Sequence, residues 1–159
     1  MRILGIDPGY ERLGIAILEK NKNNKCEQVI FSECFKTSAK LEFPERIKLI
    51  GEEVQKIIKK YKPEVLSIET LFLNTNQKTV MQVAEVRGVV LYEAVCHGLK
   101  IFEASPPQIK IATTGYGRAN KEQIMKMVKI LVNIDKSKQS DDELDAIAIA
   151  LTGLACLRN

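Results

Sequence analysis

Near its start the chain reads Arg2-Ile3-Leu4-Gly5-Ile6-Asp7-Pro8-Gly9, an apolar run that meets a carboxylate and then two turn-forming residues. The run over residues 2–7 predicts a short buried strand, and Pro8-Gly9 predicts the turn that ends it. Burying an unpaired carboxylate costs several kcal/mol, so we expect Asp7 at the edge of the sheet, in a cleft or on a cation. A strand-end acid that faces water is the simpler alternative for this residue taken alone.

Beyond this strand, apolar runs and helical spacings alternate along the chain. Short apolar runs predict four more strands, over 13–18, 26–35, 64–69 and 100–104. Amphipathic stretches predict helices over 42–61, 78–97, 121–132 and 142–157, with a short helical turn opened at 105–107 and a loop over 113–120. Three antiparallel strands followed by two that helices connect form an α/β fold with a five-stranded mixed sheet, flanked by helices on both faces. This is the arrangement of ribonuclease H-like folds.

Length and composition limit the possible classes of protein. The chain has 159 residues, 45% of them hydrophobic and 28% charged, which predicts one globular domain over residues 1–159 and argues against disorder. No apolar run approaches the ~18–20 residues of a membrane span, and Asp7 interrupts any signal peptide, so a cytoplasmic protein without membrane contact is predicted. The four cysteines form no CxxC pair and His97 is the single histidine, which argues against a structural zinc site.

The charges are unevenly distributed, although the net charge of +4 is modest. Residues 105–138 carry a net charge of +5, whereas residues 139–159 carry −3. A basic segment beside an acidic cluster is typical of a phosphate track that leads to a metal site. Solvated helix faces of opposite sign explain the same distribution, and charge alone favours that explanation.

Three further carboxylates qualify as partners of Asp7. Glu69 ends the predicted strand over 64–69, and two central parallel strands would bring it to the same sheet edge as Asp7. Asp142 and Asp145 lie three residues apart, on one face of the last predicted helix. A capping box from Ser140 to Glu143 accounts for the acids of the first turn, but it accounts less well for Asp145, which lies beyond it.

These four acids form an all-oxygen ligand set, the kind that Mg²⁺ prefers. The set is Asp7, Glu69, Asp142 and Asp145. Two such ions, ~3.5–4 Å apart, clamp the attacking and leaving oxygens of a phosphodiester in two-metal nucleases. The sequence therefore predicts catalytic carboxylates that hold two Mg²⁺ ions, one to activate water and one to stabilise the leaving 3′ oxygen.

Five segments resemble, in order and spacing, the RuvC family of crossover junction endodeoxyribonucleases, the Holliday junction resolvases. They are GIDPG (5–9), IETLF (68–72), QVAEVRG (82–88), SPPQIK (105–110) and DELDAIAIA (142–150). The resemblance implies a ribonuclease H-like homodimer that makes paired symmetric cuts in opposed strands of four-way junction DNA, in recombination and repair. It implies Mg²⁺ or Mn²⁺ as cofactor, the RuvA–RuvB branch-migration complex as partner, and the same four acids as metal ligands.

The resemblance also implies DNA-binding residues. Phe72 occupies the position of an aromatic that wedges into the opened junction, although from the residues alone it could equally fill the core. Lys110 and Lys121 match basic residues near the scissile phosphate, where ordinary surface lysines are the alternative. Arg87 matches another basic position, but it could equally lie on a solvated face or bond a nearby backbone carbonyl. Arg118 lies in the basic segment and completes the predicted DNA-binding set.

Three other functions remain open from the sequence. The chain could be another ribonuclease H-like nuclease, or a non-catalytic nucleic-acid-binding protein of the same fold. An actin-like nucleotide-binding protein also begins with an acidic strand turn, but such proteins need a second lobe for which 159 residues leave no room.

Overall fold

The computed structural model describes residues 1–20, 27–71, 77–132, 134 and 139–157. One five-stranded sheet forms its centre, in the order β3-β2-β1-β4-β5. The strands are β1 (Arg2–Asp7), β2 (Arg12–Glu19), β3 (Gln28–Lys36), β4 (Val65–Glu69) and β5 (Lys100–Ala104). The pairs β1–β2 and β2–β3 are antiparallel, whereas β1–β4 and β4–β5 are parallel. The predicted mixed sheet is confirmed.

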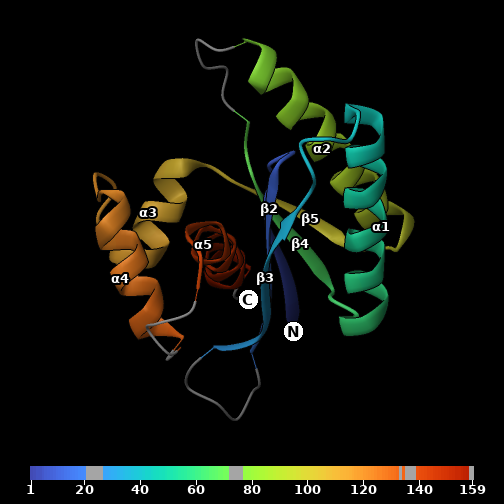
Figure 1. Ribbon diagram of the computed structural model, residues 1–159. Coiled ribbons are helices and arrows are strands. Elements are labelled where there is room, and N and C mark those ends of the chain that lie inside the picture. Colours follow the sequence, from blue (N-terminus) through green and yellow to red (C-terminus); the bar gives the residue numbers. More distant parts are fainter. Residues whose placement is uncertain (21–26, 72–76, 133, 135–138, 158–159) are drawn as a thin grey trace.

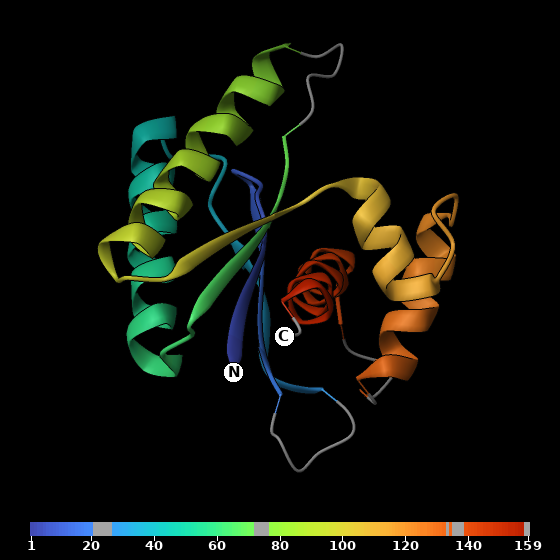
Figure 2. The ribbon, with the colours of Figure 1, turned by 180° about the vertical axis from the view of Figure 1, so that it is seen from behind.

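Helices cover both faces of this sheet (Figures 1 and 2). The helices α1 (Phe43–Tyr61) and α2 (Gln77–Cys96) lie on one face. On the other face lie α3 (Pro106–Thr114), α4 (Lys121–Leu131) and α5 (Asp141–Cys156), with α5 directly against the strands. Each face buries its own apolar cluster, so the strands carry apolar side chains on both sides. No helix in the described ranges combines the length and apolar character that crossing a membrane requires.

Two glycines allow α5 to approach the sheet backbone closely. A Cβ atom at Gly5 of β1 would lie 2.3 Å from the carbonyl oxygen of Ala146, and one at Gly14 of β2 would lie 2.1 Å from that of Asp142. Since real Cβ atoms do not come this close, only glycine fits at either position while the helix keeps its place. The first turn of α5 is thereby held beside the end of β1, where Asp7 lies.

The helix α3 is longer than the sequence predicted. It continues to Thr114, through residues assigned to a short turn and to the start of a loop. Two caps explain its length: the side chain of Gln108 accepts a hydrogen bond from the Ser105 amide at 2.9 Å, and Gly115 ends the helix with φ of 73°. Its β-branched residues had obscured the helical pattern, and the helix carries Lys110 to the site described next.

Candidate active site

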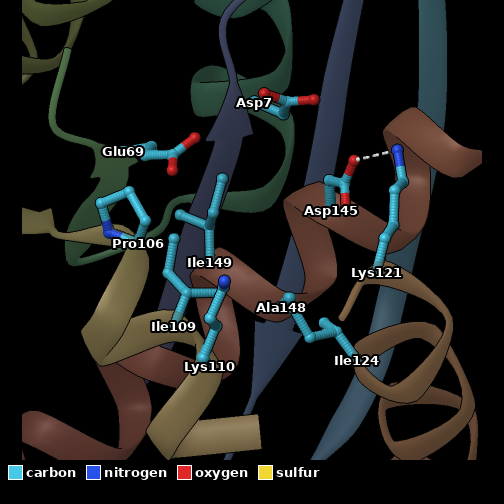
Figure 3. A pocket seen from close by; sticks show the side chains of 10 residues that line it. All are labelled: Asp7, Glu69, Pro106, Ile109, Lys110, Lys121, Ile124, Asp145, Ala148 and Ile149. Atoms are coloured by element: carbon cyan, nitrogen blue, oxygen red, sulfur yellow. Dashed lines mark ion pairs between the residues drawn. The ribbon is translucent and has the colours of Figure 1, made fainter. Parts of the chain in front are cut away.

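The parallel pairing of β1 with β4 brings two of the predicted carboxylates to one sheet edge. Ile6 pairs with Ile68, so Asp7 and Glu69 follow side by side at the carboxyl ends of the two strands. Asp145 reaches the same place from α5, and all three line one pocket of about 250 Å³ (Figure 3). Lys110 of α3 and Lys121 of α4 line it too, together with apolar residues that include Ile109 and Ile149.

The acids in this pocket repel one another. Burial raises the pKa of Asp7 to about 7, with further increases from the negative charges of Asp145, Glu69 and Asp142, and Lys121 opposes them. The pKa of Glu69 is raised by burial and by Asp145. That of Asp145 is also raised, by burial first, although Lys121 pulls it down. The pocket therefore disfavours the charged forms of its own carboxylates, which a bound cation would stabilise.

Lys121 lies at one side of the pocket and partly neutralises its acids. Its ammonium nitrogen lies 3.1 Å from a carboxylate oxygen of Asp145 (Figure 3). It also lies 3.7 Å from a carboxylate oxygen of Asp141. Asp141 itself is exposed, and it does not line the pocket. Asp141 is the first residue of α5, in its acidic first turn.

Asp142, the fourth predicted ligand, is turned away from the pocket. Its Oδ2 atom accepts a hydrogen bond from the thiol of Cys34 at 3.3 Å and lies 3.6 Å from the guanidinium of Arg12. These two residues were missed by sequence reasoning, because nothing in a single sequence shows that β2 and β3 lie beside the start of α5. The structure thus brings three of the four acids into one pocket and places the fourth beside them, facing β2 and β3.

The residues fit a hard divalent cation in kind and in charge. The donors are carboxylate oxygens, and the raised pKa of Asp7 reflects burial first and then repulsion by the other acids, both of which such a cation would offset. In the described part of the chain, however, no three His, Cys, Asp or Glu side chains already converge as a metal-ligand group. The carboxylate of Asp142 in particular is held toward Cys34 by its hydrogen bond.

The remaining predicted DNA-binding residues lie in different surroundings. Arg118 is exposed in the loop between α3 and α4, and Lys110 is half-buried in the pocket wall. Arg87 bonds a backbone carbonyl, that of Glu69, which is one of the arrangements left open by the sequence. Phe72 lies outside the described residues, although a second pocket that includes Leu71 adjoins Asp7 and Glu69.

Comparisons with known proteins agree with this geometry. Residues 3–153 match the sequence model of the family "Crossover junction endodeoxyribonuclease RuvC". A relative of that name from Caldanaerobacter subterraneus subsp. tengcongensis is 43% identical over 151 residues, which cover 95% of this chain and 90% of the relative. Another from Fusobacterium nucleatum is 39% identical over 157 residues, or 99% of this chain and 82% of the relative.

Solved structures show the same fold. Thermus thermophilus RuvC in complex with a Holliday junction substrate superimposes with a TM-score of 0.89 at 29% identity, covering 96% of this chain and 92% of that one. The yeast mitochondrial Holliday junction resolvase Ydc2 is 15% identical, with a TM-score of 0.70 over 94% of this chain and 76% of its own, and so shares the fold alone. With its family match spanning all five strands and the acids of the pocket, this chain belongs to the RuvC family of crossover junction endodeoxyribonucleases.

Proposed function

We propose that this chain resolves four-way Holliday junctions by paired cuts in opposed DNA strands, as a metal-dependent endonuclease of recombination and repair. The observation that carries the proposal is the pocket in which Asp7, Glu69 and Asp145 meet Lys110 and Lys121. Acids at the centre of the pocket suit a cation, and lysines at its side suit a phosphate diester. The same fold holds a Holliday junction in the Thermus structure.

The pocket residues divide the chemical work between them. Asp7, Glu69 and Asp145, joined by Asp142 after rotation, would hold Mg²⁺ or Mn²⁺, and we propose two ions in each site. Bound ions of this kind activate water and stabilise the leaving 3′ oxygen. Lys110 and Lys121 supply positive charge at the pocket wall, where they attract and orient the scissile phosphate, as the sequence predicted for both.

A homodimer would give this activity its junction selectivity. The outward side of α2 carries a stripe that is almost entirely apolar or small, although Glu85 lies within it. We call it the α2 stripe, and it consists of Met81, Ala84, Gly88, Tyr92 and Val95. Exposed apolar stripes of this length mark interfaces, and a two-fold contact would bury the same stripe on both copies. The two-fold axis of such a dimer would fix the two active sites so that each one meets one of two opposed strands in a four-way junction.

The remaining expectations rest on the family resemblance. The RuvA–RuvB complex, which moves junctions in the family, is the partner we propose for the assembled dimer. A cytoplasmic location and a single nuclease domain over residues 1–159 stay predictions. Arg118, exposed between α3 and α4, and Phe72 stay predicted DNA contacts.

A cleavage assay tests the proposed function. We expect a synthetic four-way junction to be cut in two opposed strands with Mg²⁺ or Mn²⁺, while linear duplex of the same arm sequence stays intact. Asp7→Asn should lower the cutting rate by about a thousandfold or more, since a metal ligand supports several kcal/mol of transition-state stabilisation. Its junction binding should persist or tighten, because one charge that repels phosphates is gone. Equal cutting of both substrates would contradict the proposal, and so would an Asp7→Asn variant that cuts as fast as the unmodified chain. The second result would indicate a non-catalytic binding protein with a contaminating nuclease.

A further inference from the structure

Arg87, a residue of α2, bonds to residues of two strands, β4 and β5. Its side chain is only 16% exposed. The Nε atom donates a hydrogen bond to the carbonyl oxygen of Glu69 at 3.2 Å, and the Nη2 atom forms an ion pair with the carboxylate of Glu103. Arg87 therefore joins α2 to the end of β4 and to β5 through two different partners.

The hydrogen bond from Arg87 reaches Glu69, which is the last residue of β4. Glu69 pairs with Ala104 at the end of the β4–β5 ladder, and the next amide, that of Thr70, donates to Ala104 at 2.9 Å. The carbonyl of Glu69 is held by Arg87 of α2. A guanidinium is a planar, rigid fork, so two simultaneous bonds fix its plane and the groups it holds. The peptide group that follows Glu69 is thus held at its carbonyl by Arg87 and at its amide by Ala104.

We propose that Arg87 is a positioning residue for Glu69: it fixes the backbone from which this carboxylate enters the pocket, and it does not contact DNA phosphates. The proposal rests on the proposed function, because it takes Glu69 as a metal ligand. It differs from the DNA-binding role that the family resemblance implied for Arg87. The side chain is only 16% exposed, and two of its three guanidinium nitrogens already bind a carbonyl and a carboxylate, which favours a structural role over a phosphate contact.

The chain contains a matched control. Arg2 makes the same kind of bridge, donating to the Glu19 carboxylate at 2.8 Å and to the Tyr61 carbonyl at 2.9 Å. It lies at the opposite end of β1 from Asp7, so its loss costs comparable contacts without touching the pocket. Arg2→Met and Arg87→Met therefore separate general destabilisation from an effect on the metal site.

The test measures Mn²⁺ binding directly, from the electron paramagnetic resonance signal of the free ion. Arg87→Met should weaken Mn²⁺ binding by about tenfold, the usual effect of removing a group that orients a metal ligand. Arg2→Met should bind Mn²⁺ like the unmodified chain even if it melts at a lower temperature. Glu103→Gln, a milder change at a half-exposed side chain, should weaken Mn²⁺ binding in the same direction by less, and it serves if Arg87→Met does not fold.

Junction binding without metal separates positioning from phosphate contact. Positioning predicts that Arg87→Met and Arg87→Lys bind the four-way junction like the unmodified chain, with the same salt dependence, and that Lys fails to restore Mn²⁺ affinity. A phosphate contact would instead be rescued by Lys, and its loss in the Met variant would lower the slope of log affinity against log salt by about one.

The inference would be overturned by an Mn²⁺ affinity that Arg87→Met leaves unchanged, by an equal loss in Arg2→Met, or by the reduced salt slope. An unmodified chain that binds no Mn²⁺ would overturn it too, by removing the metal site. An unmodified chain that binds Mn²⁺ but cuts no junction would defeat the proposed function while leaving the role of Arg87 intact.

Discussion

At the scale of single residues, Asp7 shows how strongly the pocket disfavours a negative charge on its own carboxylate. Its pKa near 7 means that the native state holds a proton that the unfolded chain, with a carboxyl pKa near 3.8, has released. Between these two values the native state binds more protons than the unfolded state. The free energy of unfolding therefore falls as the pH rises from 4 to 7, by up to about 4 kcal/mol from this group. The same charge that destabilises the fold is the charge that a cation requires.

Because the charge on Asp7 destabilises the fold, we expect Asp7→Asn to stabilise the metal-free protein. At pH 8 with a chelator, the variant should melt several degrees above the unmodified chain, because it has no charge to desolvate. The advantage should shrink toward pH 4 and should also shrink at pH 8 when Mg²⁺ is added. Thermal unfolding followed by circular dichroism across this pH range measures both effects. A variant that melts lower than the unmodified chain at every pH would show that Asp7 is not under repulsion.

At the scale of elements, the approach of α5 to the sheet sets where its acids lie. Gly14→Ala would place a Cβ atom 2.1 Å from the carbonyl of Asp142 and 3.1 Å from the Cβ of Asp7. The first turn of α5 must then move off β2, which we expect to cost about 1–3 kcal/mol of stability and to weaken Mn²⁺ binding. Gly117→Ala, whose Cβ meets only the end of Ile111 at 3.5 Å, should change the unfolding free energy by less than about 1 kcal/mol. Denaturant titration of both variants checks the difference, and equal stabilities would show that α5 is not held by this contact.

The elements also show what one sequence can and cannot predict. The meeting of Asp7 and Glu69 was predictable, because parallel neighbouring strands end at one edge and both acids end apolar runs. The orientation of Asp142 was not, since it depends on Cys34, which lies 108 residues away. Nor was the inward position of Arg87 predictable. The helix α2 is apolar on its outer stripe as well as its inner side, so its pattern does not reveal which side faces the sheet.

At the scale of the whole molecule, the α2 stripe and the pocket are linked by the two-fold symmetry that paired cutting requires. A single copy has one pocket, and cutting two opposed strands of one junction requires a second pocket in a fixed relation to the first. The stripe offers that relation, because Tyr92 and Val95 are about two-thirds exposed on a helix whose other side is buried against the sheet. The same helix carries Arg87, so the proposed interface and the backbone of Glu69 share one rigid element.

Breaking the stripe should therefore abolish paired cutting while each pocket survives. We expect the unmodified chain to have the mass of two copies by light scattering, and Tyr92→Glu to have the mass of one, since a buried carboxylate at a two-fold contact would face its own copy. The variant should still bind Mn²⁺, but it should lose concerted cutting of four-way junctions. Ile130→Glu, at a comparably exposed apolar residue on α4 across the sheet, should remain dimeric and cut normally. A dimeric Tyr92→Glu, or a monomeric Ile130→Glu, would place the interface elsewhere, and the selectivity for branched DNA would then need an explanation that does not involve α2.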